Sequence, residues 1–301
     1  MKILILGSEG FIGSNAVRYF RELGYDVYGG DIILKQEGKY FLINPELPEF
    51  SSIFIKEKFD VCINATGAAN VQLSFEYPSL DFSLNTANVF AILEAIRKHN
   101  ASCRFINLSS AAVYGNPASL PVTETSALNP LSPYGFHKLY SEFICREFHQ
   151  MFSIETISLR IFSAYGEGLK KQLFWDLQKK ILNSQDGVVS MFGTGMETRD
   201  FIYINDLLKA IHLIILKSKF YGQAVNIASG IETTIKNAVE TFVKVSSCDF
   251  EVQFLGAAKV GDPVNWKADI SILSEIGFFP DFSLEQGLIN YYKWVTEKKL
   301  P

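Results

Sequence analysis

The sequence has little cysteine and no long apolar run, and each shortage excludes a class of protein. Its four cysteines, Cys62, Cys103, Cys145 and Cys248, are far apart, and none forms a Cys-x-x-Cys pair. A disulfide scaffold or a thiolate metal site is therefore not indicated, and we expect buried free thiols and no bound metal. Charged residues interrupt every apolar run before it reaches the length of a membrane-spanning helix.

An excess of charge of one sign is also absent. The chain has 28 Lys and Arg against 32 Asp and Glu, mixed along its length, for a net charge of −4. Such a chain has no bulk attraction for nucleic acid or anionic membranes. The first residues, MKILILG, resemble a strand and lack the architecture of a signal peptide. We therefore expect a cytoplasmic protein that binds neither nucleic acid nor membranes.

What the chain does have is a regular alternation of strand and helix patterns. Hydrophobic residues make up 48% of the total, enough for a large core. Alternation of this kind predicts an α/β fold, a doubly wound and mostly parallel sheet of Rossmann type with helices on both faces. The expected strands are 2–6, 25–30, 60–65, 103–108 and 154–161, and the expected helices are 11–23, 79–99 and 134–151.

The alternation weakens after residue 165, where loops rich in glycine and proline appear. We interpret residues 1–165 as a dinucleotide-binding domain, to which residues 201–228 return. Residues 166–200 and 229–301 are expected to form a smaller substrate-binding domain.

A glycine-rich turn follows the first strand. Gly7, Gly10 and Gly13 lie in GSEGFIG, with Phe11 and Ile12 at the opening of the next helix. A turn of this kind brings backbone N–H groups and a helix N-terminus against a pyrophosphate, and Cβ atoms would block that approach. These five residues are therefore predicted to bind a dinucleotide cofactor.

Asp31 ends the second strand, 18 residues after Gly13. A carboxylate there accepts hydrogen bonds from the ribose hydroxyls of an adenosine and repels a 2′-phosphate. The position therefore favours NAD over NADP. Lys35 lies close by in the sequence and would soften that discrimination.

Two further segments suggest proton-transfer chemistry. Tyr134 and Lys138 lie four residues apart in SPYGFHK, on one face if the segment is helical. An ammonium beside a phenol favours the phenolate, which then exchanges a proton with a substrate hydroxyl. Ser110 follows the strand 103–108, at the sheet edge where ligands bind, and Ser109 beside it is the competing choice.

These motifs together resemble the extended short-chain dehydrogenases/reductases of the NAD-dependent epimerase/dehydratase family, relatives of UDP-galactose 4-epimerase. The resemblance covers nearly the whole chain. It implies a Rossmann-type fold, bound NAD, a nucleotide-sugar substrate and a homodimer formed through helices 79–99 and 134–151. The matching segments are GSEGFIG (7–13), LSSAAVYG (108–115), PYGFHK (133–138), LRIFSAYG (159–166), RDFIYINDL (199–207), NIASG (226–230) and KVGDPVNWKAD (259–269).

The resemblance also implies roles for particular residues. Ser110 would hold the reacting hydroxyl, Tyr134 would be the catalytic base, and Lys138 would assist it and bind the nicotinamide ribose. Arg199 resembles the arginine that binds the nucleotide diphosphate, for which a planar guanidinium is well suited. The alternative for Arg199 is a structural ion pair with an acid such as Asp206.

The sequence departs from the family pattern in three ways. Ala111 and Ala112 stand where the 4,6-dehydratases have Asp-Glu, which excludes the elimination of water. Lys259 and Ser163, both expected to bind substrate, replace a common arginine and asparagine, and leave the identity of the substrate open. The pair Lys170–Lys171 either compensates at the diphosphate or is a solvated loop pair.

The leading hypothesis is an NAD-dependent nucleotide-sugar epimerase that acts at C4 through a 4-keto intermediate. The first alternative is an NAD(P)H-dependent reductase of a 4-keto-6-deoxy nucleotide sugar. The second is a non-catalytic dinucleotide-binding sensor. His137 lies one step from the helix face of Tyr134, and we assign it no catalytic role.

Overall fold

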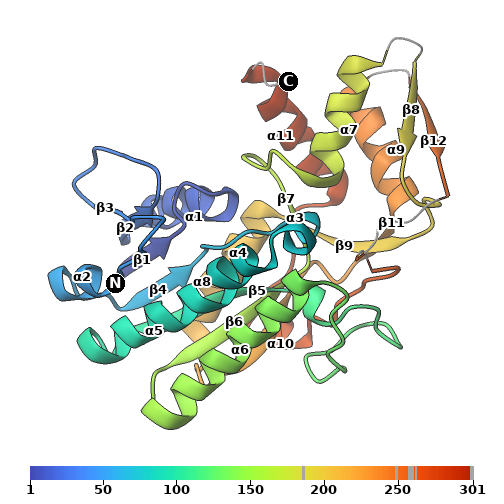
Figure 1. Cartoon of the computed structure of the whole chain (residues 1–301). Helices are drawn as coiled ribbons and strands as arrows, with labels where there is room; N and C mark the ends of the chain where they lie inside the picture. Colours follow the sequence, from blue (N-terminus) through green and yellow to red (C-terminus); the bar gives the residue numbers. More distant parts are fainter. Residues whose placement is uncertain (185–186, 248–249, 257–260, 262, 299–301) are drawn as a thin grey trace.

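A computed structural model describes residues 1–184, 187–247, 250–256, 261 and 263–298. Its main sheet has seven strands in the order β10-β6-β5-β4-β1-β2-β3, and every neighbouring pair is parallel (Figure 1). The predicted α/β doubly wound fold is thereby confirmed. The strands are β1 (Lys2–Leu6), β2 (Asp26–Asp31), β3 (Tyr40–Leu42), β4 (Val61–Asn64), β5 (Arg104–Ser110), β6 (Thr156–Ile161) and β10 (Gln223–Ile227).

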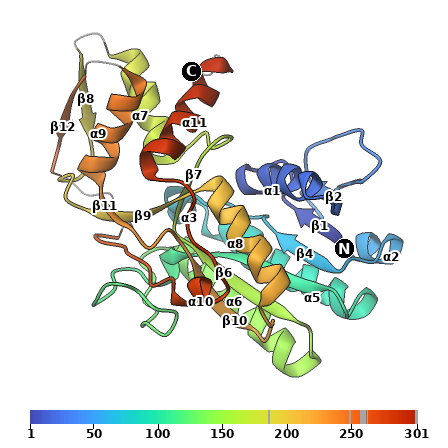
Figure 2. The same cartoon turned by 180° about the vertical axis from the view of Figure 1, so that it is seen from behind.

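Helices cover both faces of this sheet. On one face lie α2 (Ser51–Lys56), α5 (Asn88–His99) and α6 (Pro133–Phe152), which contact one another in that order. On the other face α1 (Phe11–Glu22) contacts α8 (Ile204–Lys217) (Figure 2). The sheet is therefore the central layer of three.

The residues of β1 show why this strand is a continuous apolar run. Ile3 and Ile5 belong to the core cluster that includes residues of α1 and α8, whereas Leu4 and Leu6 belong to the cluster that includes residues of α5. All four are fully buried. Successive side chains of a strand point to opposite faces, so a sheet covered on both faces requires apolar residues at every position.

The single helix predicted at 79–99 is wrong in detail. The structure has α4 (Pro78–Phe82), a π-helical turn at Ser83–Ala87, and then α5. Within the turn, Asn85 Nδ2 donates to a side-chain oxygen of α4 and, at 3.2 Å, to the carbonyl of Ala68 in the loop after β4. A π-helical turn adds one residue to a helix, which the spacing of apolar residues does not reveal.

Most of the remaining strands and helices form a second lobe, which extends to the upper right of Figure 1. There β7, β9 and β11 form a small sheet, β8 and β12 form a parallel pair, and α9 packs against α7 and α11. The bounds are β7 (Ser163–Tyr165), α7 (Gln172–Asn183), β8 (Val188–Met191), β9 (Thr198–Tyr203), β11 (Glu232–Thr234), α9 (Ile235–Ser246), β12 (Glu251–Phe254) and α11 (Leu284–Glu297); the two short helices α3 (Val71–Glu76) and α10 (Ser271–Glu275) lie outside this lobe.

Three cysteines lie in the described part of the chain. Cys62, Cys103 and Cys145 are buried free thiols, and Cys248 lies outside the described residues. Across the described ranges, no cluster of three or more His, Cys, Asp or Glu side chains could hold a metal ion. No helix in those same ranges is both long enough and apolar enough to cross a bilayer.

Candidate active site

The glycine turn joins β1 to α1 at very close range. Gly7 has φ +79°, and its N–H donates to the carbonyl of Gly30 at 2.7 Å. A Cβ on Gly13 would lie 1.9 Å from the carbonyl oxygen of Gly7, and a Cβ on Gly7 would lie 2.5 Å from that of Ala65. Side chains at Gly7 and Gly13 would therefore force the backbone of the turn apart.

The N-terminus of α1 is suited to bind an anion. Its N-cap is Gly10, which provides no capping side chain, and the first turn has no acidic residue. The first N–H groups of a helix have no partner within the helix, and the helix dipole favours negative charge there. The nearby Ser8 Oγ is buried without a hydrogen-bond partner in the described chain. Phe11 and Ile12, both half-buried, pack against the core and fix this end. The glycine turn and the first N–H groups of α1 thus form a cradle that fits the pyrophosphate of a dinucleotide.

Asp31 lies beside this turn. Its Oδ2 accepts the N–H of Glu9 at 2.9 Å and its Oδ1 accepts the N–H of Ile32 at 2.7 Å. Lys35 makes ion pairs with Glu9 at 3.2 Å and with Glu37 at 2.9 Å. The positive charge that would favour a 2′-phosphate is thus already shared between two glutamates, while Asp31 is fixed next to the cofactor cradle.

Ser110, Tyr134 and Lys138 come together at the carboxyl edge of the sheet. Ser110 ends β5, and α6 begins with the N-cap Ser132 and Pro133, a combination that starts helices. Tyr134 and Lys138 are both buried. Lys138 Nζ lies 5.9 Å from the centre of the Tyr134 ring and donates to a backbone carbonyl of β5 at 2.9 Å. The structure therefore brings all three predicted catalytic side chains to one place.

The electrostatics of this cluster leave the tyrosine protonated when the protein is alone. Burial raises the pKa of Tyr134 to about 12, and the interaction with the Ser110 hydroxyl opposes the rise. Burial lowers the pKa of Lys138 to about 8, and the charge of Asp81 opposes the fall. A positive charge close to Tyr134 would lower its pKa towards neutral.

The structure distinguishes the two adjacent serines. The Ser109 hydroxyl is buried and donates to Glu142 Oε1 at 2.6 Å, and Glu142 also makes a buried ion pair with Arg160 at 2.7 Å. Ser110, the next residue along the strand, points away from Ser109; its Oγ accepts the N–H of Ala112 at 3.2 Å, and its hydroxyl interacts with Tyr134. Ser109 therefore belongs to the core and Ser110 to the candidate site.

The two residues that follow Ser110, Ala111 and Ala112, have no acidic or basic side chain. Ala111 is fully buried and Ala112 is half-buried, in a short 3-10 turn. The first turn of α6 packs against it so closely that a Cβ on Gly135 would lie 2.8 Å from the carbonyl oxygen of Ala112. The methyl groups of Ala111 and Ala112 cannot exchange protons, so these two residues cannot act as an acid and a base.

Two of the predicted substrate-binding residues, Ser163 and Arg199, lie on the small sheet of the second lobe. Ser163 of β7 is paired with Phe201 of β9, two residues after Arg199. Arg199 Nη1 donates to the carbonyls of Thr198 at 2.8 Å and Val264 at 3.2 Å. Lys259 lies outside the described residues.

The alternative role of Arg199 is a structural ion pair with an acid such as Asp206. The carboxylate of Asp206 accepts the backbone N–H groups of Asp281 at 2.9 Å and Phe282 at 3.2 Å. The guanidinium of Arg199 lies 5.6 Å from the ring of Trp266. Asp206 therefore has a structural role of its own, at the start of α8.

Two features of the site were not foreseen from the sequence. Lys171, just before α7, donates to the carbonyl of Ala69 at 3.1 Å, and its charge lowers the pKa of Lys138. His137 makes a 2.6 Å contact with the buried Asp81. Both contacts join residues that are far apart in the sequence, so no local motif predicts them.

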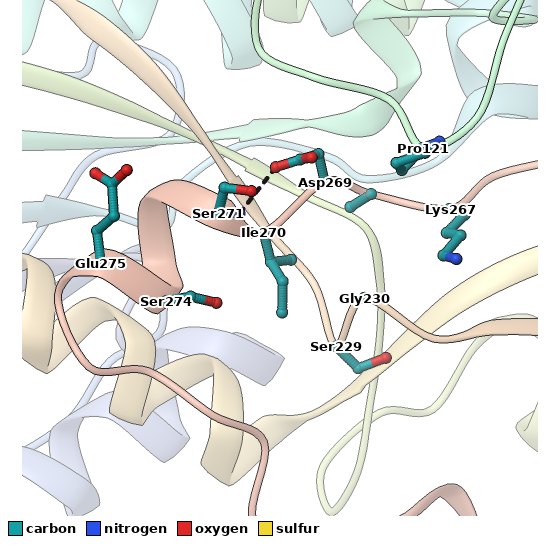
Figure 3. A pocket seen from close by; sticks show the side chains of 10 residues that line it. Pro121, Ser229, Gly230, Lys267, Asp269, Ile270, Ser271, Ser274 and Glu275 are labelled. Atoms are coloured by element: carbon teal, nitrogen blue, oxygen red, sulfur yellow. Dashed lines mark hydrogen bonds between the residues drawn. The ribbon is translucent and has the colours of Figure 1, made fainter.

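A separate shallow groove of about 590 Å³ lies beside β10 and α10 (Figure 3). None of the predicted site residues lines it, and its one marked hydrogen bond is local, from the Ser271 N–H to Asp269 Oδ1 at 2.8 Å. The groove is therefore not part of the candidate site. Its lining residues are Pro121, Ser229, Gly230, Lys267, Ala268, Asp269, Ile270, Ser271, Ser274 and Glu275.

Comparison with known proteins gives matches along nearly the whole chain. The model of the NAD dependent epimerase/dehydratase family matches residues 3–228. The putative UDP-glucose 4-epimerase of Methanocaldococcus jannaschii is 32% identical over 97% of this chain and 98% of its own. The uncharacterized UDP-glucose epimerase YtcB of Bacillus subtilis is 30% identical over 98% of both. The structure of UDP-glucuronic acid 4-epimerase from Bacillus cereus, solved with UDP-glucuronic acid and NAD, has a TM-score of 0.88 and 27% identity, covering 99% of this chain and 100% of that one.

Proposed function

Because this chain belongs to the NAD-dependent epimerase/dehydratase family, as its motifs predicted, we propose that it is an NAD-dependent nucleotide-sugar epimerase that acts at C4. The observation that carries the proposal is the cluster of the half-buried Ser110 with the buried Tyr134 and Lys138. Relatives named UDP-glucose 4-epimerase and UDP-glucuronic acid 4-epimerase support the choice of reaction.

The side chains of the cluster divide the proton chemistry between them. The Tyr134 phenolate takes the proton of the sugar 4-hydroxyl, and Ser110 donates a hydrogen bond to the same oxygen. The Lys138 ammonium stabilises the phenolate and would also bind the nicotinamide ribose. When bound, NAD supplies a reversible acceptor for the hydride of the sugar C4. It also supplies a positive ring charge, which favours the Tyr134 phenolate. The glycine turn and Asp31 would hold its pyrophosphate and adenosine ribose.

The nucleotide part of the substrate is expected to carry most of the binding. Arg199 and Lys171 provide positive charge for the diphosphate, and Ser163 and Lys259 are proposed to bind nearby. A site that binds the diphosphate tightly and the sugar weakly allows the keto sugar to turn and present its opposite face to the returning hydride. We propose that residues 1–165 with 201–228 form the cofactor domain, and 166–200 with 229–301 the substrate domain.

The test is to incubate the purified protein, without added cofactor, with UDP-glucose, UDP-glucuronic acid and UDP-N-acetylglucosamine, and to resolve the products by NMR. Appearance of a C4 epimer of any of these is the expected result. Oxidation of NAD(P)H with a 4-keto-6-deoxy nucleotide sugar, without epimerisation, would instead establish a reductase. Binding of NAD with neither reaction would indicate a sensor.

We also propose a homodimer in the cytoplasm. The described cysteines are free thiols, which suits a reducing compartment. On α6, Phe136, Tyr140 and Phe143 form a stripe at the spacing of one helix face, and each is more than 40% exposed. Phe82 and Phe90, on α4 and α5, are exposed to a similar degree. An aromatic surface shared by adjacent helices is what two copies would bury against each other.

The dimer predicts the effect of one substitution. Phe143→Glu is expected to give a folded monomer, because two carboxylates would face each other across an apolar interface. Light scattering coupled to gel filtration gives the mass. Leu216→Glu, at an exposed leucine on α8, is the matched control and should remain a dimer. A monomeric wild type, or a dimeric Phe143→Glu, would contradict the proposal.

A further inference from the structure

A buried Asp–His hydrogen bond lies next to the catalytic cluster and has no part in the proton transfer described above. Asp81 of α4 is 1% exposed, and its Oδ2 lies 2.6 Å from Nδ1 of His137, on the turn of α6 between Tyr134 and Lys138. A carboxylate only accepts hydrogen bonds, so Nδ1 of His137 carries the proton. A buried carboxylate is costly unless it is paired, which fixes His137 in place.

The same carboxylate is tied to the cofactor side of the site. Its Oδ1 accepts a hydrogen bond from Asn85 Nδ2 at 3.0 Å, and Asn85 also donates to the carbonyl of Ala68 in the loop after β4. The backbone of that loop rests on Asn85, since a Cβ on Gly67 would lie 2.4 Å from Asn85 Oδ1. Asp81 therefore connects the loop after β4 to the first turns of the catalytic helix.

A second contact joins the π-helical turn to the same helix. Thr86 Oγ1 donates to the backbone carbonyl of His137 at 2.9 Å. The ring of His137 also packs edge-on against Phe82, with centroids 5.4 Å apart. His137 is thus restrained through its ring nitrogen, its ring face and its backbone.

The charge of Asp81 acts on both catalytic side chains. It raises the pKa of Tyr134 and opposes the fall in the pKa of Lys138. Among the other groups that face them, Ser110 lowers the pKa of Tyr134, whereas Glu142 raises and Lys171 lowers that of Lys138. Within the described part of the chain, Asp81 is the one charged side chain whose charge acts on the pKa of both Tyr134 and Lys138.

We propose that Asp81 and His137 are a positioning pair for Tyr134 and Lys138: the carboxylate fixes the first turns of α6 and places its charge beside both side chains. The inference rests on the proposed function, because it assigns Tyr134 as the group whose ionisation limits turnover. It gives His137, which the sequence left without a role, a structural reason to occupy its position.

Asp81→Asn is the direct test. It keeps the shape of the side chain and removes the charge, so the pKa of Tyr134 falls. The acid limb of the pH profile of kcat/KM is expected to move to lower pH by about 0.5–1 unit. The alkaline limb should move the same way, because the pKa of Lys138 also falls. A carboxylate with a merely structural role would lower activity at every pH without moving either limb.

His137→Leu tests the donor side of the pair. It removes the hydrogen bond that joins Asp81 to α6, and a buried carboxylate without a donor is harder to ionise. The acid limb is therefore expected to move to lower pH, as in Asp81→Asn, and kcat/KM at the optimum to fall. Asp206→Asn neutralises a buried carboxylate elsewhere and should leave the limbs in place. The positioning pair is refuted if Asp81→Asn moves neither limb, or if His137→Leu keeps the wild-type kcat/KM and limbs.

A measurement that needs no turnover separates this inference from the proposed reaction. The NAD-bound protein with 13C-labelled tyrosine is titrated by NMR, and the Tyr134 resonance is identified by its loss in Tyr134→Phe. In Asp81→Asn this resonance is expected to titrate at lower pH than in wild type, whether or not a nucleotide sugar is epimerised. An unchanged titration overturns the pair even if the epimerase activity is confirmed.

Discussion

Tyr134→Phe is expected to lower kcat by about 10²–10⁴-fold, the range ascribed to a positioned acid or base. The phenol interacts with Ser110 at the carboxyl edge of the sheet, and phenylalanine fills the same buried space. Folding and NAD affinity should therefore be close to those of wild type. The measurements are the initial rate with the substrate found in the nucleotide-sugar panel, the thermal midpoint and a calorimetric NAD titration.

Tyr140→Phe is the matched control for this loss. Tyr140 lies on the same helix but is 42% exposed and outside the cluster, so its phenol should be dispensable. The assignment of Tyr134 as base fails if Tyr134→Phe retains most of the wild-type rate, or if it loses activity only because it no longer binds NAD.

Gly13→Ala is expected to have the largest effect on the folded structure. The new Cβ would lie 1.9 Å from the carbonyl oxygen of Gly7, a backbone atom that moves only if the whole turn moves. Overpacking of this kind costs about 1–3 kcal/mol or more, and here it also opens the cradle for the pyrophosphate. We expect a lower thermal midpoint without ligand and at least about tenfold weaker binding of NAD, which corresponds to about 1.4 kcal/mol.

Two other glycines serve as graded comparisons. A Cβ on Gly10 would lie 3.3 Å from the same carbonyl oxygen, so Gly10→Ala should weaken NAD binding with little change in the stability of the free protein. Gly38→Ala meets no atom within 4 Å and should change neither property. Equal effects at Gly10 and Gly13 would show that contact with Gly7 is not the cause.

Much of the fold followed from local pattern. The buried parallel strands are continuous apolar runs, and the helices between them have one apolar face, so their order could be predicted. The small sheet of the second lobe could not. Strands β7 and β11 have three residues each, too few to show a period of two, and their pairing with β9 joins segments distant in sequence.

Some residues of the candidate site could likewise be predicted from local motifs, and others could not. Gly7, Tyr134 and Lys138 stand in short motifs whose spacing carries a physical meaning. The choice between Ser109 and Ser110 depends on which face of β5 each side chain occupies, and a strand end cannot be located to one residue from sequence. The contact of Asp81 with His137 spans 56 residues and depends on the packing of α4 against α6.

The place of β10 at the edge of the main sheet has a consequence for the order in which the chain is made. Its only partner in that sheet, β6, consists of six buried residues, and residues 162–222 are synthesised between the two. At about 5–20 residues per second, translation of that stretch takes several seconds. During this time the nascent chain carries an apolar strand with an open edge, the arrangement most prone to pair with another chain. Part of the second lobe and α8 lie between β6 and β10 in the sequence. This order is therefore expected to leave the growing protein open to aggregation until β10 leaves the ribosome.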